Sequence, residues 1–499
     1  MSHWQLPWRG PVRRVDRGGQ TTGWDVMAAP SLGEAMVVGV AVIYNRNGHP
    51  RLVVQTGLPQ ALQWKTARVG EWTTVPVAAP GQTVIYLMKY DQVPDIPDST
   101  FSDKGLQPRQ LQWYGQVMAE INAVLEELAD LHGESIEDFL FMDDAMFDAR
   151  RLFGAPPADS VTVAFGSCQY PAGMFDRALA EHSWRRLSSH LRSTVTVHPE
   201  CLLLLGDQIY ADATAGLLDP LKSDDRYNTP HEDFLRIPGV RDVMRRIPVH
   251  MMLDDHEIQD NWEPFRPRLK GTRLEQGLDA YWRYQRGQAH PPARYDTWFK
   301  LDGPHWCAFM ADSRTLREYR SASRPGEALI LGSAQTADLE TWLLSGDNAG
   351  KLKLVCSPAM LLPRHVEHQA EPDYLDNWDG YPGSLVRMLS FVFDNRLSDV
   401  CFLSGDAHLG CDAHITVSCG PDKVMFRSIH TTSLYAPFPF ANEREANLKL
   451  DDEFSFSMAG RTYNVKVQAT AAPDRDGWTL LRAGRDPVTG EWDIQASTM

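Results

Sequence analysis

The stretch CLLLLGDQIYAD, residues 201–212, joins a strongly apolar run to polar side chains at its end. Four consecutive leucines are typical of a strand that is buried on both faces, as in an α/β protein. Asp207, Tyr210 and Asp212 follow directly. Because ligands of open α/β sheets bind at the carboxyl ends of strands, we interpret Asp207 and Tyr210 as candidate binding residues. We interpret Asp212 as a loop residue and assign it no role.

Four further apolar runs end in the same way. They are VTVAFGSCQ (161–169), VHMMLDDHEIQDNW (249–262), WCAFMADSR (306–314) and DVCFLSGDAH (399–408). Helical patterns lie between several of these runs, which predicts an α/β layout with buried strands. We expect the five strand ends to converge on one site that includes Cys168, Asp207, Tyr210, Asp254, Asp255, His256, Glu257, Asp260, Asn261, Asp312, Arg314, Asp406 and His408.

Taken singly, each of these residues has an ordinary structural explanation. Asp207 suits a turn or a helix cap, and Tyr210 suits a core aromatic with a satisfied hydroxyl. Cys168 suits a small buried hydrophobe, and His408 suits a hydrogen-bonded core histidine. The run DDHE (254–257) also suits a solvated charged surface. These explanations do not account for five such strand ends in order on one chain, so we favour a metal site.

The donor types indicate which metals such a site would hold. Carboxylates, an imidazole, a thiolate and a phenolate together suit a redox-capable transition metal beside a harder divalent ion. A two-metal centre can bridge a phosphoryl oxygen and generate hydroxide at neutral pH. Gly206 and Gly405 precede two of the acids and would allow close approach of the backbone. Arg314 is suited to clamp a phosphate bidentately.

Charge and composition exclude several classes of protein. The net charge is −16 over 499 residues, which argues against sequence-independent binding to DNA or to anionic membranes. The apolar run at 35–44 is too short to span a bilayer. The seven cysteines form no CxxC pair, which argues against a zinc ribbon. The sequence after Arg13 and Arg14 is polar where a secretory signal would be apolar, so we expect a cytoplasmic location.

The pattern divides the chain into three regions. Residues 1–157 combine strand patterns at 36–44 and 83–90 with an amphipathic helix at 111–128, and they carry no chemical motif, so we expect an N-terminal accessory domain. Residues 158–440 contain the five strand ends and should form the catalytic domain. Residues 441–499 return to alternation and should form a β-rich extension packed on that domain.

The ordered motifs resemble those of the PhoD-like (alkaline phosphatase D) family of calcineurin-like metallophosphoesterases. The matching segments are FGSCQ (165–169), GDQIY (206–210), LDDHEIQDN (253–261), ADSRTLREYR (311–320), LGSAQTADLETWL (331–343), WDGYP (378–382) and LSGDAHLG (403–410). The resemblance implies a four-layer sandwich of two mixed β-sheets flanked by helices. It also implies hydrolysis of phosphodiesters or phosphomonoesters, with iron(III) bound by a tyrosinate and calcium or another divalent ion, such as manganese or zinc, as its partner.

The resemblance also assigns roles to individual residues. Cys168 matches a thiolate ligand, Asp207 the bridging carboxylate, Tyr210 the phenolate, and Asp406 with His408 the last ligand pair. Asp255 matches the asparagine of the broader superfamily's G-N-H-E motif, and Asn261 is a second candidate for that position. His256 matches the histidine that contacts the phosphate or protonates the leaving group, and Arg314 matches an arginine that faces the phosphate.

Chemistry and resemblance predict that a hydroxide at a dinuclear or multinuclear metal centre attacks the phosphorus of a small-molecule phosphate ester. We expect neither nucleic acid nor membrane as a partner, and the sequence leaves the oligomeric state open. A nuclease, a phospholipase or a cyclic-nucleotide phosphodiesterase on the same fold are alternatives. A metal-binding scaffold without turnover is a further one, although such a scaffold would not need His256 and Arg314.

Overall fold

The computed structural model describes most of the chain from residue 159 onward and parts of the region before it. The described ranges are 10–17, 20–30, 35–44, 50–51, 63–76, 82–89, 141–142 and 159–499, the last with gaps at 174–175, 194–196, 214–220, 223, 265–271, 288–296, 322–325, 367–376, 438–443 and 473–474. The helix expected at 111–128 lies outside these residues. The chain divides into two compact units, the first formed by residues 1–155, 235–248 and 287–289 and the second by the rest.

Two sheets form the described part of the first unit. One has the order β1 (Val12–Arg17), β2 (Gln20–Val26) and β6 (Thr73–Pro76). The other has the order β4 (Pro50–Arg51), β3 (Ala35–Tyr44), β7 (Gln82–Lys89) and β8 (Phe141–Met142), with β5 (Gln63–Ala67) paired to β3. The strand patterns at 36–44 and 83–90 are therefore confirmed as strands. Helix α7 (Pro238–Arg246) packs on β1, so residues from the middle of the sequence complete this unit.

A six-stranded sheet in the second unit carries three of the five predicted strand ends. Its order is β11 (Val249–Met251), β10 (Leu202–Leu204), β9 (Ser160–Gln169), β21 (Thr479–Arg485) and β22 (Trp492–Thr498), and β18 (Ser433–Tyr435) also pairs with β9. Strands β9, β10 and β11 are parallel, whereas β21 is antiparallel to β9. The three parallel strands therefore end at the same edge of the sheet.

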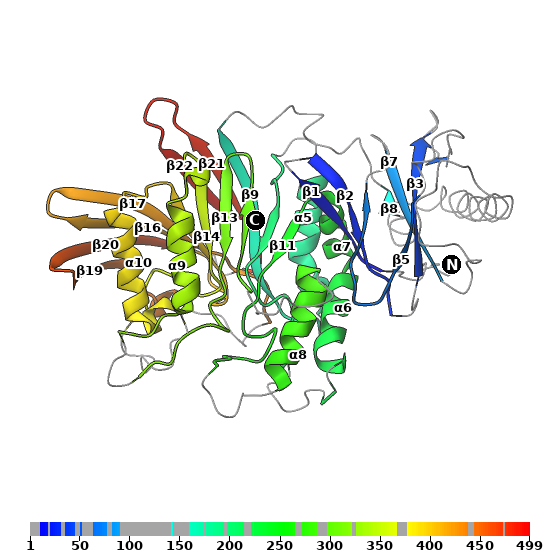
Figure 1. Cartoon of the computed structure of the whole chain (residues 1–499), viewed down its shortest axis with the longest axis horizontal. Coiled ribbons are helices and arrows are strands. Elements are labelled where there is room, and N and C mark those ends of the chain that lie inside the picture. The colour runs from blue at the N-terminus through cyan, green and yellow to red at the C-terminus, as the bar shows by residue number, and fades with distance from the viewer. Residues whose placement is uncertain are drawn as a thin grey trace. The chain divides into compact units, whose positions relative to one another are not determined.

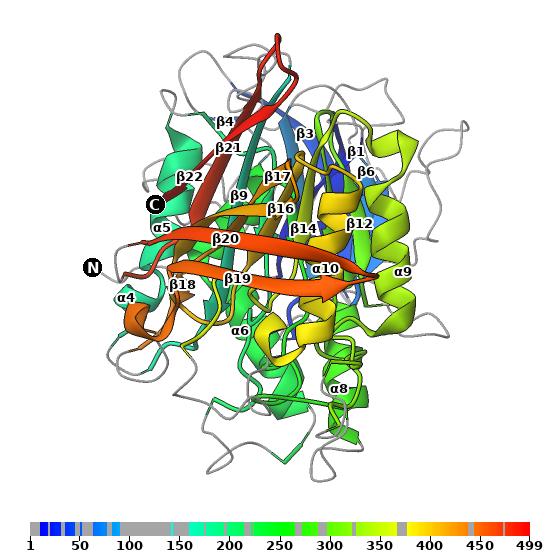
Figure 2. The ribbon, with the colours of Figure 1, turned by 90° about the vertical axis from the view of Figure 1, so that its left-hand side faces the viewer.

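An eight-stranded sheet carries the other two strand ends. Its order is β12 (Phe299–Asp302), β13 (Trp306–Met310), β14 (Leu352–Cys356), β15 (Val400–Ser404), β17 (Asp422–His430), β16 (Cys411–Cys419), β20 (Arg461–Ala471) and β19 (Asp451–Met458). Strands β13, β14, β15 and β17 are parallel and the others are antiparallel. Figure 2 shows β19 and β20 as a long hairpin at the edge of this sheet.

The two sheets of the second unit share one hydrophobic core. Val163 and Phe165 of β9 pack in it with Ala308 of β13, Leu354 of β14 and Leu403 of β15. The α/β class and the mixed character of both sheets are thus confirmed. Because strands β19–β22 belong to these two sheets, residues 441–499 supply strands to both of them.

Helices cover the outer face of the eight-stranded sheet. Helices α9 (Gly332–Leu343) and α10 (Pro382–Asp394) pack against it in a second core (Figure 1). In α10 the buried side chains Leu385, Met388, Leu389 and Val392 recur at helical spacing and form one apolar face, and Pro382 begins the helix. The other helical segments within the described residues are α4 (Arg177–Ala180), α5 (His182–Arg192), η3 (Asp224–Asn228), α6 (Thr229–Arg236), α8 (Thr272–Ala280), η5 (Tyr281–Arg286), η6 (Gly346–Asn348), η8 (Trp378–Gly380) and η9 (Glu445–Asn447).

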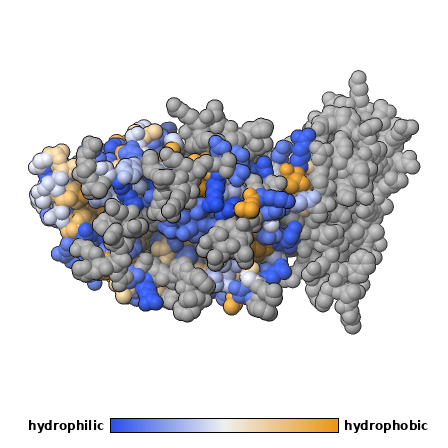
Figure 3. All heavy atoms as spheres, turned by 90° about the horizontal axis from the view of Figure 1, so that it is seen from below, coloured by the Kyte–Doolittle hydropathy of each residue, from blue (hydrophilic) through white to orange (hydrophobic). Residues whose placement is uncertain are grey.

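The described surface mixes hydrophilic residues with scattered hydrophobic ones, as Figure 3 shows for one face. Single exposed apolar residues are ordinary on protein surfaces. Within the described ranges, no helix has both the length and the hydrophobicity that a bilayer crossing requires.

Candidate metal centre

The five strand ends contribute to one buried cluster of side chains. Asp207, which follows β10, belongs to three groups whose potential ligand atoms all lie within 4.8 Å of one another. The groups are Cys168 with Asp207 and His408; Asp207 with Asp255 and His256; and Asp207 with Asp254, Asp255 and Asp406. Asp207 is therefore the residue that the three groups share, and both sheets supply members.

The backbone around the cluster is unusual. Eight described non-glycine residues have positive φ, and five of them are predicted ligands, with φ of 60° at Cys168, 56° at Asp207, 50° at Asn261, 77° at Asp406 and 59° at His408. Side chains other than glycine seldom adopt this region, and such conformations concentrate at functional sites. The strand ends therefore carry local strain at the predicted ligands.

Two glycines allow these strand ends to approach one another. Gly206 has φ +102°, and a Cβ atom there would lie 2.4 Å from the Cβ of Asp254. A Cβ at Gly405 would lie 2.2 Å from Oγ of Ser167. The sequence suggested that these glycines admit the backbone to the metals; in the structure they make room for the neighbouring strand ends.

One side of the cluster presents sulfur, nitrogen and a phenol. Sγ of Cys168 lies 3.6 Å from Oδ2 of Asp207, and the hydroxyl of Tyr210 lies 3.3 Å from Nε2 of His408. All four side chains are buried. The ring of Tyr210 also packs against His256, with centroids 4.1 Å apart.

The other side of the cluster presents carboxylates around a buried arginine. Arg314 is fully buried and donates two hydrogen bonds to the carboxylate of Asp254. Its Nε donates to Oδ1, and its Nη2 donates to Oδ2 at 3.4 Å. Its Nη2 also lies 3.2 Å from Oδ2 of Asp406 and 3.5 Å from Oδ1 of Asp255. Oδ1 of Asp255 is buried and accepts no hydrogen bond from the described residues. Arg314 thus lies among the acids that the sequence predicted as ligands.

The cluster has more acidic groups than one arginine can neutralise. Burial and the carboxylates of Asp207 and Asp406 raise the pKa of the Cys168 thiol well above its usual value. Burial, Cys168 and Asp207 do the same to the pKa of Tyr210. Burial and Asp254 raise the pKa of Asp207. A bound cation reverses these effects and favours the ionised donors, so the cluster fits a metal centre by charge and by donor type.

His256 is oriented by an acid that the sequence did not single out. Its Nδ1 lies 2.7 Å from Oδ1 of Asp212, and the other carboxylate oxygen of Asp212 accepts the backbone N–H of Asp260. Burial lowers the pKa of His256, but Asp255, Asp207 and Asp212 outweigh it and raise that pKa well above its usual value. The imidazole is therefore held in one orientation and favours its protonated form.

Glu257 ties two ligand-bearing turns together. Its Oε2 accepts the backbone N–H of Asp207 at 3.1 Å and of Asp254 at 2.9 Å, and its Oε1 accepts that of Gln208 at 2.8 Å. The side chain is fully buried. Glu257 is therefore a structural partner of the cluster, positioned to fix the spacing between the turns after β10 and β11.

The side chain of Asn261 is the one predicted ligand that the structure does not bring to the others. Asn261 is exposed, and its Nδ2 donates to Oδ1 of Asp260 at 3.0 Å. Its backbone N–H donates to Asp255. The sequence placed Asp254 and Glu257 in the expected site without a specific role for either, and it assigned no role to Asp212.

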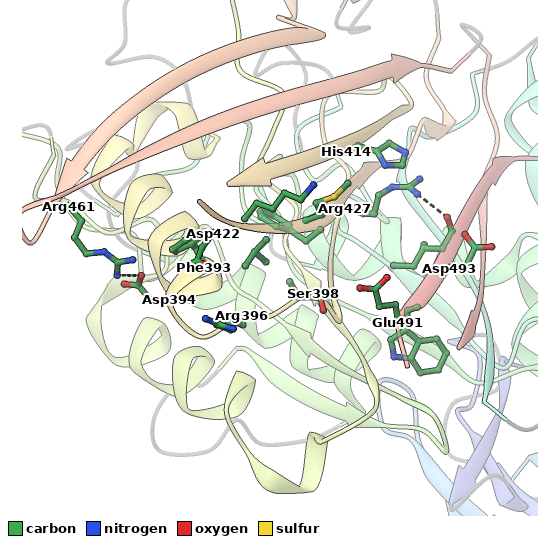
Figure 4. Close-up of a pocket in the computed structure, with 17 residues that line it drawn as sticks. Phe393, Asp394, Arg396, Ser398, His414, Asp422, Arg427, Arg461, Glu491 and Asp493 are labelled. Atoms are coloured by element: carbon green, nitrogen blue, oxygen red, sulfur yellow. Dashed lines mark hydrogen bonds and ion pairs between the residues drawn. The ribbon is translucent and has the colours of Figure 1, made fainter. Parts of the chain in front are cut away.

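A separate cavity lies at the other end of the eight-stranded sheet. It has a volume of about 580 Å³, and its lining includes Val400 at the start of β15, whereas Asp406 follows the end of that strand. Arg396, His414, Arg461, Glu491 and Asp493 give it both signs of charge (Figure 4). None of the predicted site residues lines this cavity.

Comparison with known proteins identifies the family. The family model of the PhoD-like phosphatases matches residues 164–492, so this chain belongs to that family and the resemblance drawn from the motifs is confirmed. Alkaline phosphatase D of Bacillus subtilis (strain 168) is 22% identical over 275 residues, which cover 50% of this chain and 46% of that protein. The match thus spans about half of either length.

A solved structure supports the fold. The structure described as "Structure of PhoD" aligns with a TM-score of 0.53 and 14% sequence identity, covering 98% of this chain and 88% of the other. At this identity the likeness concerns the fold alone.

Proposed function

We propose that this protein hydrolyses small-molecule phosphate esters, either diesters or monoesters, at a centre of two or more metal ions. The observation that carries the proposal is the buried cluster in which Asp207 is common to three groups of potential ligands. Membership of the PhoD-like phosphatase family supports it. When bound, such ions would activate water as a nucleophile and neutralise phosphoryl charge.

The donor types divide between two candidate positions. Cys168, His408 and Tyr210 offer a thiolate, an imidazole and a phenolate, which suit iron(III). Asp254, Asp255 and Asp406 offer oxygens alone, which suit calcium or another hard divalent ion such as manganese. Asp207 would bridge the two positions. The reducing conditions of a cytoplasmic location would keep the Cys168 thiol free.

Two residues of the chain would act on the substrate. His256 would donate a proton from Nε2 to the leaving oxygen, because its Nδ1 proton is engaged by Asp212. Arg314 would hold Asp254 and Asp406 in place and stabilise charge on the phosphate. Asn261 would act as a ligand only if its side chain turned away from Asp260.

We also propose the domain organisation that the sequence predicted. Residues 1–157 would form an accessory domain, with residues 235–248 and 287–289 added to it, residues 158–440 would otherwise form the catalytic domain, and residues 441–499 would form a β-rich extension packed on that domain. The shared core of the two sheets and the helices α9 and α10 support three layers of a four-layer sandwich.

Elemental analysis of freshly purified protein is the first test. About one iron and at least one second metal per chain supports the centre as proposed. Two zinc or manganese ions per chain would be consistent with the proposed hydrolysis but would contradict the assignment of iron. No metal, even after refolding with metals supplied, would overturn the proposal. Hydrolysis of p-nitrophenyl phosphate and bis(p-nitrophenyl) phosphate then tests the reaction.

The variant His256→Ala separates an enzyme from a scaffold. An enzyme should lose about 10²- to 10⁴-fold in kcat while its metal content stays unchanged, because His256 would move a proton in the reaction. If the wild-type protein binds its metals and hydrolyses neither ester, the alternative hypothesis of a metal-binding scaffold without turnover is favoured.

A further inference from the structure

A line of buried side chains leads from Glu257 away from the candidate ligands. Nε2 of Gln285 lies 3.2 Å from Oε1 of Glu257 and 3.2 Å from Nε2 of His231. Nδ1 of His231 lies 2.7 Å from the carbonyl oxygen of Tyr227. The three side chains are at most 4% exposed. We call Glu257, Gln285, His231 and the Tyr227 carbonyl the Gln285 relay.

Hydrogen-bond chemistry gives this relay one direction. An ionised carboxylate only accepts hydrogen bonds, so Gln285 must turn its NH₂ group toward Glu257. The second hydrogen of that NH₂ group then requires an acceptor at Nε2 of His231. A neutral imidazole provides it when its proton sits on Nδ1 and is donated to Tyr227. Burial supports the neutral form, since it lowers the pKa of His231 to about 4.

The elements that carry the relay pack directly on the turn that holds Glu257. A Cβ atom at Gly277 of α8 would lie 2.7 Å from the carbonyl oxygen of Glu257, so the helix and the turn are in close contact. Gln285 lies on η5, a π-helical segment that continues α8, and such segments often mark functional sites. His231 of α6 stacks on Tyr284 of η5, with centroids 5.1 Å apart and ring planes at 12°.

We propose that Gln285 and His231 are positioning residues for the metal centre. The inference rests on the centre of the proposed function. Gln285 holds the Glu257 carboxylate in the orientation that receives the N–H groups of Asp207, Gln208 and Asp254. Without the Gln285 side chain, the turns after β10 and β11 would lose their fixed spacing. The carboxylates of Asp207 and Asp254 would then not be held at the positions that bind a metal ion.

Two measurements on Gln285→Leu test this proposal. Calorimetric titration of chelator-treated protein with Mn²⁺ should show an affinity about 10- to 100-fold below wild type, the usual effect of losing an outer partner of a metal site. Amide hydrogen exchange of the metal-free protein should show faster exchange at Asp207, Gln208 and Asp254. Neither readout needs catalytic activity.

Tyr284→Phe is the matched control. It removes a hydrogen bond from the same helical segment, between the Tyr284 hydroxyl and Oε1 of Glu232 at 2.8 Å, and leaves the relay intact. It should keep the Mn²⁺ affinity and the exchange rates of the wild type. The proposal is overturned if Gln285→Leu matches this control in both measurements.

A second variant keeps the test decisive if Gln285→Leu does not fold. His231→Phe keeps a ring against Tyr284 and removes the acceptor for Gln285, so Mn²⁺ affinity should fall several-fold; an unchanged affinity overturns the proposal.

A protein that binds Mn²⁺ but hydrolyses no phosphate ester contradicts the proposed function alone. If the wild type binds no Mn²⁺, hydrogen exchange still decides whether Gln285 fixes the two turns.

Discussion

Asp212 accepts a hydrogen bond from Nδ1 of His256 at 2.7 Å and leaves Nε2 as the imidazole atom available to a substrate. The Asp212 side chain is 3% exposed and that of His256 is 20% exposed, so the pair is largely shielded from water while the histidine keeps some access to it. A buried acid behind an accessible histidine fixes both the tautomer and the direction of the ring.

We therefore expect Asp212→Asn to lower kcat by about 10- to 100-fold while metal content is unchanged, because His256 loses the partner that orients it. The Asp212 carboxylate also contributes to the raised pKa of His256. Without it the proton is lost at lower pH, so the alkaline limb of the kcat profile should move to lower pH. Asp225→Asn, an exposed acid in η3, is the control. A kcat within twofold of wild type with an unmoved alkaline limb would contradict the assignment.

The buried arginine should be important for stability as well as for chemistry. Arg314→Met leaves Asp254 and Asp406 without their cation, and removing one partner of a buried ion pair costs about 3–5 kcal/mol. Urea unfolding of the metal-free protein should show this loss, and added Mn²⁺ should restore part of it by taking the place of the charge. Arg387→Met, which breaks a partly exposed pair with Glu340, should cost less than about 1 kcal/mol. Equal costs for the two variants would contradict this account.

Gly206 should tolerate no side chain. In Gly206→Ala the new Cβ would meet the Asp254 side chain, and the φ of +102° is unfavourable for alanine, so we expect a loss of at least about 2 kcal/mol in the free energy of unfolding. Gly346→Ala is the matched control, since nothing lies within 4 Å of its added Cβ. Urea denaturation checks both variants. A Gly206→Ala protein as stable as the control would show that the two turns separate freely.

Stability should depend on His231 in acid. Its folded-state pKa of about 4 lies below the usual 6.5, so the unfolded chain binds the proton more readily. The stability that His231 provides is therefore present above pH 6.5 and is lost as the pH falls toward 4, by about 3 kcal/mol in total. Urea unfolding should give the free energies of unfolding of the wild type and of His231→Phe at pH 7 and at pH 4. The difference between these two free energies should be smaller at pH 4 than at pH 7 by this amount. A difference that stays constant with pH would show that His231 titrates normally.

The sequence predicted which side chains at the strand ends come together, but not which residues hold those side chains in place. Cys168, Asp207, Asp255, Asp406 and His408 follow apolar runs, and a parallel strand places whatever follows it at a known edge. The role of Asp212 was not predictable, because a contact between residues 212 and 256 depends on the path of two turns. The sequence placed Glu257 in the site but not its structural role, since its partners are backbone N–H groups that no sequence pattern marks.

The order of the strands in the two sheets could not be predicted from the sequence either. Alternating patterns indicated strands after residue 441, but nothing local showed that β21 would pair with β9 or that β20 would pair with β16. Such pairings arise from long-range packing of the two cores, which depends on the whole chain.

Strand β9, which carries Cys168, pairs with β10, with β21 along residues 160–165, and with β18 at Ser167 and Gln169. During synthesis on the ribosome, residues 160–169 emerge long before residues 479–485. Until then residues 160–165 of β9 lack their antiparallel partner, and an unpaired strand edge is prone to pair with other chains. Completion of the sheet that supports the cluster is thus a late event of translation.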